Sequence, residues 1–343
     1  MKLEEYAKKT FLALKNPFGT VVSVDPLVID KASYSFEIND CAYYVGVKNT
    51  NVIPQSLLTR LEEKGFLMHT RDVMAYGGRA IDIYHRNPIT DRFMTGSSSG
   101  TALNVFYGIN DLGIGTDGGG SVLAPAAALN LIGFISPTME EEQLKKFSKK
   151  STDGIEFYPS VGYITRDFEV LKRAVEASIS LEETTEEYTI VLNSDQSNKI
   201  EQQFLEVVKK QLATTKIEEQ EYPNRSTGRE ELISYLNKLK ENQILISVEG
   251  PVDTVGIGDT VFGHFDAETK KSQEASGKGF MRVANMCNKS AMTIPLKELG
   301  MCAVFICDSN PKAIAMMLKI TEQVQIEQSE LIKRYFSNLN MYF

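Results

Sequence analysis

The stretch that decides the fold runs from residue 95 to residue 138 and reads TGSSSGTALNVFYGINDLGIGTDGGGSVLAPAAALNLIGFISPT. Two clusters of small residues, 96–100 (GSSSG) and 117–121 (DGGGS), enclose a segment with helix and strand signals. Glycine loses more conformational freedom on folding than other residues, so three consecutive glycines before a serine require a reason. One reason is close backbone approach to a ligand, with successive N–H groups directed at a developing oxyanion. The alternative is a pair of flexible loops, and the apolar helix signals after both clusters favour the first interpretation.

This stretch resembles the amidase signature, whose pattern is approximately GGSSGGS, a helix and a strand, and then GTDxGGSIRxPA and GLKPT. Ser97 matches the first serine of the first cluster, and Ser121 matches the serine of GGS. The two serines are 24 positions apart, which equals the family spacing. The residues TDGGGS, AP and GFISPT follow in order. The chain is therefore identified as a shortened and diverged member of the amidase-signature family of Ser–cis-Ser–Lys amidohydrolases.

The resemblance continues more weakly along nearly the whole chain from about residue 30. The matching segments are Asn87-Pro88 with Arg92, 56–70, 160–171 and 283–296. Family members have an α/β fold in which helices wrap a mixed β-sheet, and the resemblance implies the same fold here. It also implies one trimmed amidase-like domain over residues 1–343, and a cis peptide bond between Gly96 and Ser97.

The resemblance implies a set of catalytic roles as well. Ser121 would be the nucleophile, and Ser97 would relay its proton to a neutral lysine and later protonate the departing amine. The backbone N–H groups of Gly118, Gly119, Gly120 and Ser121 would form the oxyanion hole. The implied substrate is a small-molecule amide, and neither a cofactor nor a metal is implied.

Two residues compete for the position of the family lysine, which ends a strand reading V-K-D with a glycine six residues after the aspartate. The segment 36–40, followed by Gly46, reproduces this spacing and puts Asn39 at the lysine position. An amide cannot accept a proton near neutral pH, so the general base would be missing. Lys48, in the segment VGVKN (45–49), is the competing base. Against it, the helix signal at Ser56 follows only eight positions later, fewer than in the family. We predict that Asn39 ends a buried strand facing Ser97 and that Lys48 points to solvent.

Two further departures lie near the expected pocket. Leu123 occupies the arginine position of SIR, and Arg71 with Met74 replaces the family pattern TNMxEF. These losses leave three hypotheses: a weakened or retuned hydrolase of C–N bonds, a pseudoenzyme that serves as a catalytically silent binding or scaffolding subunit, and an amidotransferase component. The presence of both serines favours the hydrolase.

Hydrophobic periodicity supports an α/β fold, because helix and strand signals alternate along the chain. Helices are expected at 4–15, at 54–65 with Ser56 as its cap, at 101–109 and at 167–180, and a long helical region at 311–336. Strands are expected among the runs at 20–47, including YSFEI at 34–38, and at 189–193, 243–248, 289–296 and 301–308.

Composition narrows the classes of partner. The net charge of −8 provides no basic surplus for nucleic acid. No run reaches the roughly 18 apolar residues of a membrane span, and the N-terminus lacks the apolar core of a signal peptide, so a cytoplasmic protein is expected. The four cysteines, at positions 41, 287, 302 and 307, form no CxxC motif, so free thiols are expected and not a metal site. Histidines 69, 85 and 264 give a Ser–His–Asp site only weak support. Both a homodimer and a complex with a partner subunit are compatible with this composition.

Overall fold

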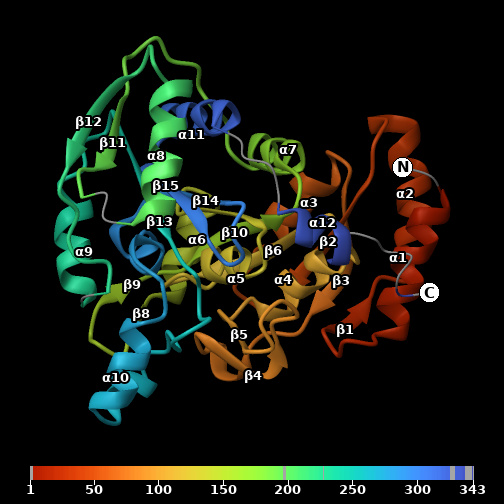
Figure 1. Ribbon diagram of the computed structural model, residues 1–343. Coiled ribbons are helices and arrows are strands. Elements are labelled where there is room, and N and C mark those ends of the chain that lie inside the picture. Colours follow the sequence, from red (N-terminus) through yellow and green to blue (C-terminus); the bar gives the residue numbers. More distant parts are fainter. Residues whose placement is uncertain (1–2, 196–197, 227, 325–328, 337–341, 343) are drawn as a thin grey trace.

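A mixed sheet of eleven strands forms the framework of the molecule (Figure 1). The computed structural model describes residues 3–195, 198–226, 228–324, 329–336 and 342. The strand order across the sheet is β1-β3-β2-β6-β10-β7-β14-β15-β13-β11-β12. In chain order these strands are β1 (Val21–Val24), β2 (Tyr43–Lys48), β3 (Phe66–Asp72), β6 (Leu112–Asp117), β7 (Ile132–Ser136), β10 (Ser160–Thr165), β11 (Thr189–Asn193), β12 (Lys216–Gln220), β13 (Gln243–Glu249), β14 (Lys289–Pro295) and β15 (Cys302–Asp308).

The sheet is antiparallel in its middle and parallel on either side of it, and its edge strand β1 pairs antiparallel with β3. Strand β2 lies parallel to β3 and β6, and β11 lies parallel to β12 and β13. From β6 to β13 every pairing is antiparallel. Figure 1 shows β1 to β3, in red and orange, at the opposite end of the sheet from the green β11 and β12. The expected α/β fold with a mixed sheet is therefore confirmed.

Helices cover both faces of this sheet because its strands are apolar on both sides. Along β15, Ala303, Phe305 and Cys307 belong to one core, whereas Cys302, Val304 and Ile306 belong to the other. The first core is completed by α3 (Gln55–Glu62), α7 (Phe168–Ser178), α8 (Lys199–Gln211) and α11 (Pro311–Gln323). The second is completed by α4 (Ser99–Phe106), α5 (Leu123–Ala128), α9 (Arg229–Leu236) and α12 (Glu330–Phe336).

The remaining elements lie around these two layers. They are α1 (Leu3–Lys15), α2 (Val28–Asn39), α6 (Glu141–Leu144), α10 (Ala267–Glu274), the short 3₁₀ turns at 76–78, 145–147, 262–264, 280–282 and 285–287, and two small hairpins, β4 (Ile81–Arg86) with β5 (Phe93–Thr95) and β8 (Lys149–Lys150) with β9 (Glu156–Phe157). Among the described residues, no helix combines the length and apolar character needed to cross a membrane.

One local prediction is wrong in a way that matters for the site. Residues 34–38 (YSFEI), expected to be a strand, belong to helix α2. The buried positions of α2 are Val28, Ala32 and Ser35, a helical spacing of four and three residues. The aromatic and β-branched residues at 34–38 suggested a strand, whereas the helical period becomes visible only over the whole of 28–39. The predicted cap at Ser56 is also wrong, because Pro54 precedes α3 and offers no side-chain bond.

The serine cluster at 97–99 is buried, as the family resemblance requires, but its backbone differs from the expectation. Ser97 is 4% exposed, and Ser98 and Ser99 are fully covered. The cis peptide bond in the described part of the chain joins Gly250 to Pro251, so the bond between Gly96 and Ser97 is trans. Gly96 has a φ of +76°, and an added Cβ would lie 2.5 Å from the ring of Pro125. Glycine is therefore required where the loop meets α5.

Candidate active site

Strand β2 delivers Lys48 to the buried serine cluster. Lys48 is the last residue of β2 and is 2% exposed. Its Nζ donates hydrogen bonds to Ser97 Oγ at 2.7 Å and to Thr116 Oγ1 at 2.8 Å. Thr116 lies on the neighbouring strand β6, which pairs with β2 through Val45 to Val47. The parallel pairing of these two strands thus brings lysine, threonine and serine together.

The position of Asn39 corrects the sequence-based alignment. Asn39 is the last residue of helix α2 and not the end of a strand, and its side-chain amide donates to Ser35 Oγ at 3.3 Å. Lys48, which we expected at the surface, has the contact with Ser97 that we assigned to Asn39. Val47-Lys48-Asn49 shares the first two letters of the V-K-D pattern and ends a strand, whereas Asn39 ends a helix.

Burial sets the charge state of Lys48. Loss of solvent lowers the pKa of its ammonium to about 7, an effect opposed by the negative charge of Asp117 and reinforced by the positive charge of Lys149. A lysine with such a pKa is substantially neutral at physiological pH and can accept a proton. The hydroxyls of Ser97 and Thr116 bind it without adding charge.

Asp117 shapes the glycine loop that follows β6. Its carboxylate accepts hydrogen bonds from the N–H groups of Gly120 at 2.7 Å, Val122 at 2.6 Å and Leu123 at 3.3 Å. Burial raises the pKa of this carboxyl, while the three N–H bonds act in the opposite direction. Gly120 adopts a φ of +96°, a conformation that favours glycine. The loop therefore turns around Asp117 before it enters α5.

This geometry distinguishes among the N–H groups predicted to hold an oxyanion. The N–H of Gly120 is already bonded to Asp117. The N–H groups of Gly118, Gly119 and Ser121 have no acceptor among the residues that the structure describes. The sequence pattern, which treats the three glycines alike, does not reveal this difference.

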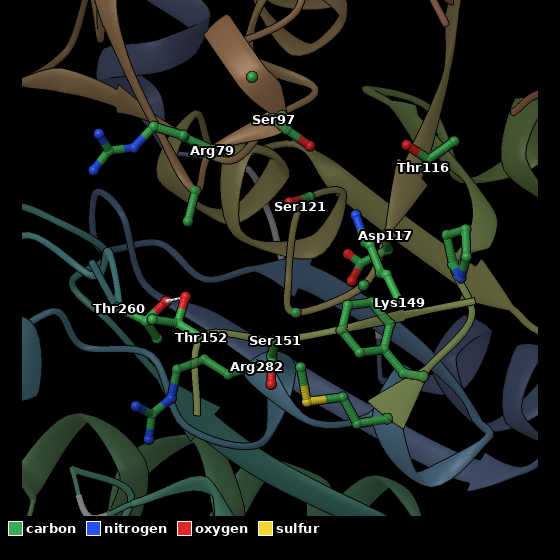
Figure 2. A pocket seen from close by; sticks show the side chains of 18 of the residues that line it. Arg79, Ser97, Thr116, Asp117, Ser121, Lys149, Ser151, Thr152, Thr260 and Arg282 are labelled. Atoms are coloured by element: carbon green, nitrogen blue, oxygen red, sulfur yellow. Dashed lines mark hydrogen bonds between the residues drawn. The ribbon is translucent and has the colours of Figure 1, made fainter. Parts of the chain in front are cut away.

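Ser97 and Ser121 line one cavity of about 670 Å³ together with Lys48 and Thr116. Figure 2 shows the two serines close together at one end of it. Their loops are in direct contact, because Ser98 N donates to Ser121 O at 3.3 Å. Gly118 and Gly119 belong to the same wall. Of the predicted constellation, the cavity is therefore lined by all residues except Asn39 and Gly120.

The histidines belong to other networks. His85 Nδ1 lies 2.7 Å from Asp82 Oδ2, and the same oxygen accepts from Ser99 Oγ at 2.5 Å. Because the carboxylate lies between the imidazole and the serine, this arrangement lacks the Ser–His contact of a Ser–His–Asp triad. His69 Nδ1 bonds to Asn110 Oδ1 at 2.8 Å in the core. His264 Nδ1 bonds to Thr260 O at 2.6 Å.

The departures from the family pattern have different positions. Leu123, at the arginine position of SIR, is fully buried at the start of α5, whereas Met74 lines the cavity. Sequence reasoning did not single out Thr116, Lys149 or Phe157, all of which also line it. Within the described ranges, no group of three or more His, Cys, Asp or Glu side chains could hold a metal ion.

Comparison with known proteins shows similarity to amidases. The amidase family model matches residues 59–227. A glutamyl-tRNA(Gln) amidotransferase subunit of Methanococcus maripaludis is 32% identical over 138 residues, which cover 38% of this chain and 31% of that protein. Amidase 1 of Arabidopsis thaliana is 36% identical over 110 residues, which cover 30% of this chain and 24% of that protein. The chain thus aligns with a third or less of each of these curated relatives.

Solved structures share the fold over most of the chain. An allophanate hydrolase of Kluyveromyces lactis superimposes with a TM-score of 0.61 and 12% identity, covering 94% of this chain and 70% of that one. A 6-aminohexanoate cyclic dimer hydrolase complexed with substrate gives a TM-score of 0.61 and 11% identity, with coverages of 97% and 96%. At these identities the similarity shows the shared fold, and the match to the family model assigns residues 59–227 of this chain to the amidase family.

Proposed function

We propose that this protein hydrolyses the C–N bond of a small amide, with Ser121 as nucleophile, Ser97 as proton relay and Lys48 as general base. The observation that carries the proposal is the 2.7 Å contact between Lys48 Nζ and Ser97 Oγ inside a buried site. This contact supplies the base that the alignment on Asn39 left out, and it favours an enzyme over a silent binding subunit.

The proposed acylation step moves one proton along the three residues. Ser121 Oγ attacks the amide carbon and gives its proton to Ser97 Oγ, while the Ser97 proton passes to the neutral amine of Lys48. The oxyanion is held by the N–H groups of Gly118, Gly119 and Ser121, which are free to donate. Gly120 contributes through the turn that it makes around Asp117.

The second half of the reaction returns that proton. Lys48 reprotonates Ser97, which protonates the leaving nitrogen as the C–N bond breaks, so that an amine or ammonia leaves and Ser121 carries the acyl group. A water molecule then attacks the ester and gives a proton through Ser97 to Lys48, and this proton returns through Ser97 to Ser121 Oγ as the bond between Ser121 and the acyl carbon breaks. The products are a carboxylic acid and an amine or ammonia, and the three residues return to their starting states.

Labelling with a fluorophosphonate tests the proposal without knowledge of the substrate. We expect covalent labelling of Ser121, and Ser121→Ala should abolish it. Lys48→Met should slow labelling by about 10²–10⁴-fold, the usual range for loss of a general base. Asn39→Ala is the matched control, because Asn39 contacts Ser35 and not the site. A folded protein whose Ser121 does not react would contradict the proposal and favour the silent binding subunit.

An amidotransferase component is the second candidate, favoured by the similarity to the amidotransferase subunits of Methanococcus maripaludis. A protein of this kind would release ammonia from glutamine or asparagine for use with a partner subunit. Ammonia release from free glutamine and asparagine, measured beside a panel of other small amides, separates the two candidates. Turnover restricted to glutamine or asparagine would support the amidotransferase component, and broader turnover would support the hydrolase.

A further inference from the structure

The cavity around Ser121 concentrates positive charge, although the chain as a whole carries a net charge of −8. Its described lining holds two carboxylates, Asp117 and Asp259. It also holds six basic side chains: Lys48, Arg79, Lys149, Lys150, Arg229 and Arg282. A cleft lined by one sign of charge attracts ligands of the opposite sign. The cations that are not already engaged by the protein decide where such a ligand binds.

Three of the six cations are engaged by carboxylates. Arg79 pairs with Asp259 at 3.0 Å, Arg229 with Asp153 at 2.5 Å, and Lys150 with Glu156 at 3.0 Å. Lys48 is buried against Ser97 and belongs to the catalytic set. Arg282 donates to the backbone carbonyls of Gly279 and Arg225. Five of the six side chains therefore have partners within the protein.

Lys149 differs from the other five. Within the described part of the chain, no carboxylate forms an ion pair with it, and its Nζ lies 5.6 Å from the ring centroid of Phe157. Lys149 faces Phe157 across the hairpin of β8 and β9. Phe157 in turn packs against Gly118, where an added Cβ would lie 2.3 Å from the ring. The contacts from Gly118 through Phe157 therefore hold the ammonium of Lys149 beside the nucleophile loop.

Figure 2 agrees with these contacts and shows Lys149 extending into the cavity toward Asp117. Asp117 does not neutralise Lys149, because its oxygens are buried and bonded to backbone N–H groups. Lys149 thus presents an exposed ammonium within the cavity lining, near the loop that carries Ser121.

We propose that Lys149 is a specificity residue that binds a carboxylate on the substrate, so that the preferred substrates are amidic acids, compounds with one amide and one carboxylate. This inference rests on the proposed function, in which the amide carbonyl lies at Ser121. The aliphatic part of the substrate would lie along the ring of Phe157. The carboxylate would accept a charge-assisted hydrogen bond from Lys149, which selects it over a neutral isostere.

Binding to the inactive Ser121→Ala protein tests this inference separately from turnover. Malonamate, succinamate and glutaramate would be titrated by calorimetry beside their neutral isosteres malonamide, succinamide and glutaramide. We expect at least one acid to bind about tenfold more tightly than its isostere, the effect of one partly exposed charged hydrogen bond. The advantage should shrink as salt is added, because the ammonium is exposed to solvent.

Two variants locate the effect. In the Ser121→Ala background, Lys149→Met should bring the acid and its isostere to equal affinity. Lys146→Met removes the same charge three positions away, outside the cavity lining, and should preserve the preference. Equal affinities in all three pairs, no measurable binding of any acid, or a preference that survives Lys149→Met would overturn the inference. Ser121 labelling in the unaltered protein reports on the proposed function independently.

Discussion

The carboxylate of Asp117 accepts the N–H of Gly120 at 2.7 Å, and the turn that carries Ser121 closes around this bond. The same carboxylate accepts the N–H of Val122 at 2.6 Å, so it binds the residue before Ser121 and the residue after it. A single buried side chain therefore fixes both the direction of the glycine N–H groups and the start of α5. The nucleophile loop depends on Asp117 for its shape and not on glycine flexibility alone.

Asp117→Asn should impair the reaction more than the fold. The amide oxygen can accept from one N–H group, but its NH₂ cannot accept from the other, so the loop loses one of its two short bonds. We expect Ser121 labelling to slow by about 10–100-fold, in keeping with a displaced oxyanion donor. The free energy of unfolding should change by about 1–3 kcal/mol, as measured by urea denaturation. Labelling at the unaltered rate would show that the loop keeps its shape without this carboxylate.

The labelling rate should depend on pH through Lys48. Burial lowers the pKa of this lysine to about 7, so the neutral amine is scarce below pH 7 and predominates above it. The rate should therefore rise about tenfold per pH unit below pH 7 and level off above it. Lys48→Arg, whose guanidinium stays protonated, should remove the pH-dependent rise. A flat profile in the unaltered protein would show that Lys48 is not the base.

Lys149 should affect the same pH profile from a distance. Its positive charge disfavours protonation of Lys48, so Lys149→Met should raise the pKa of Lys48. The midpoint of the labelling profile would then move to higher pH, and the rate at pH 7 would fall for neutral and charged reagents alike. Lys146→Met, which lies outside the cavity lining, should leave the midpoint in place. A midpoint unaffected by Lys149→Met would mean that solvent screens the interaction completely.

Gly118 and Phe157 should be coupled in a double-mutant cycle. A Cβ at position 118 would lie 2.3 Å from Phe157 Cε2, closer than two carbon atoms can approach. Gly118→Ala should therefore displace either the ring or the loop and slow Ser121 labelling. Adding Phe157→Ala removes the clash and should recover part of the rate, so the two effects should not add. Strict additivity of the single and double variants would contradict this contact.

Asp72 should make stability depend on pH. Burial raises the pKa of its carboxyl to about 7, while Oδ1 accepts from Thr70 Oγ1 and Asn104 Nδ2. The unfolded chain ionises near the ordinary value of 3.8, so rising pH favours unfolding from about pH 4 until the folded carboxyl also ionises near pH 7. The cost at pH 8 should be about 2–4 kcal/mol.

Urea unfolding at pH 5 and pH 8 measures this effect. Asp72→Asn should remove most of the difference in unfolding free energy between the two pH values, whatever its effect on stability at a single pH. Asp30→Asn, at an exposed position of α2, is the control and should preserve the difference. If Asp72→Asn retains the full pH dependence, other groups are responsible for it.

Much of the fold could be predicted because its signals are local. The apolar runs of β11, β13, β14 and β15 and the amphipathic period of helix α7 each lie within about a dozen residues. The error at 34–38 arose because five residues do not distinguish a strand from one face of a helix. Because of that error Asn39 was aligned with the catalytic lysine, although the strand-like run at 42–47 does form a strand, β2 (Tyr43–Lys48).

The sequence by itself determined the two serines, the glycine loop and their family, because these features lie within 24 positions and are set by backbone requirements. It could not decide which nitrogen meets Ser97, since Lys48 lies 49 positions away and reaches it only when β2 pairs with β6. The pKa of Lys48 follows from burial in the assembled core, a property that no local pattern encodes. Likewise, only packing of Phe157 on Gly118 places Lys149 at the cavity. Local chemistry names the candidate groups, whereas the tertiary structure determines their partners and charge states.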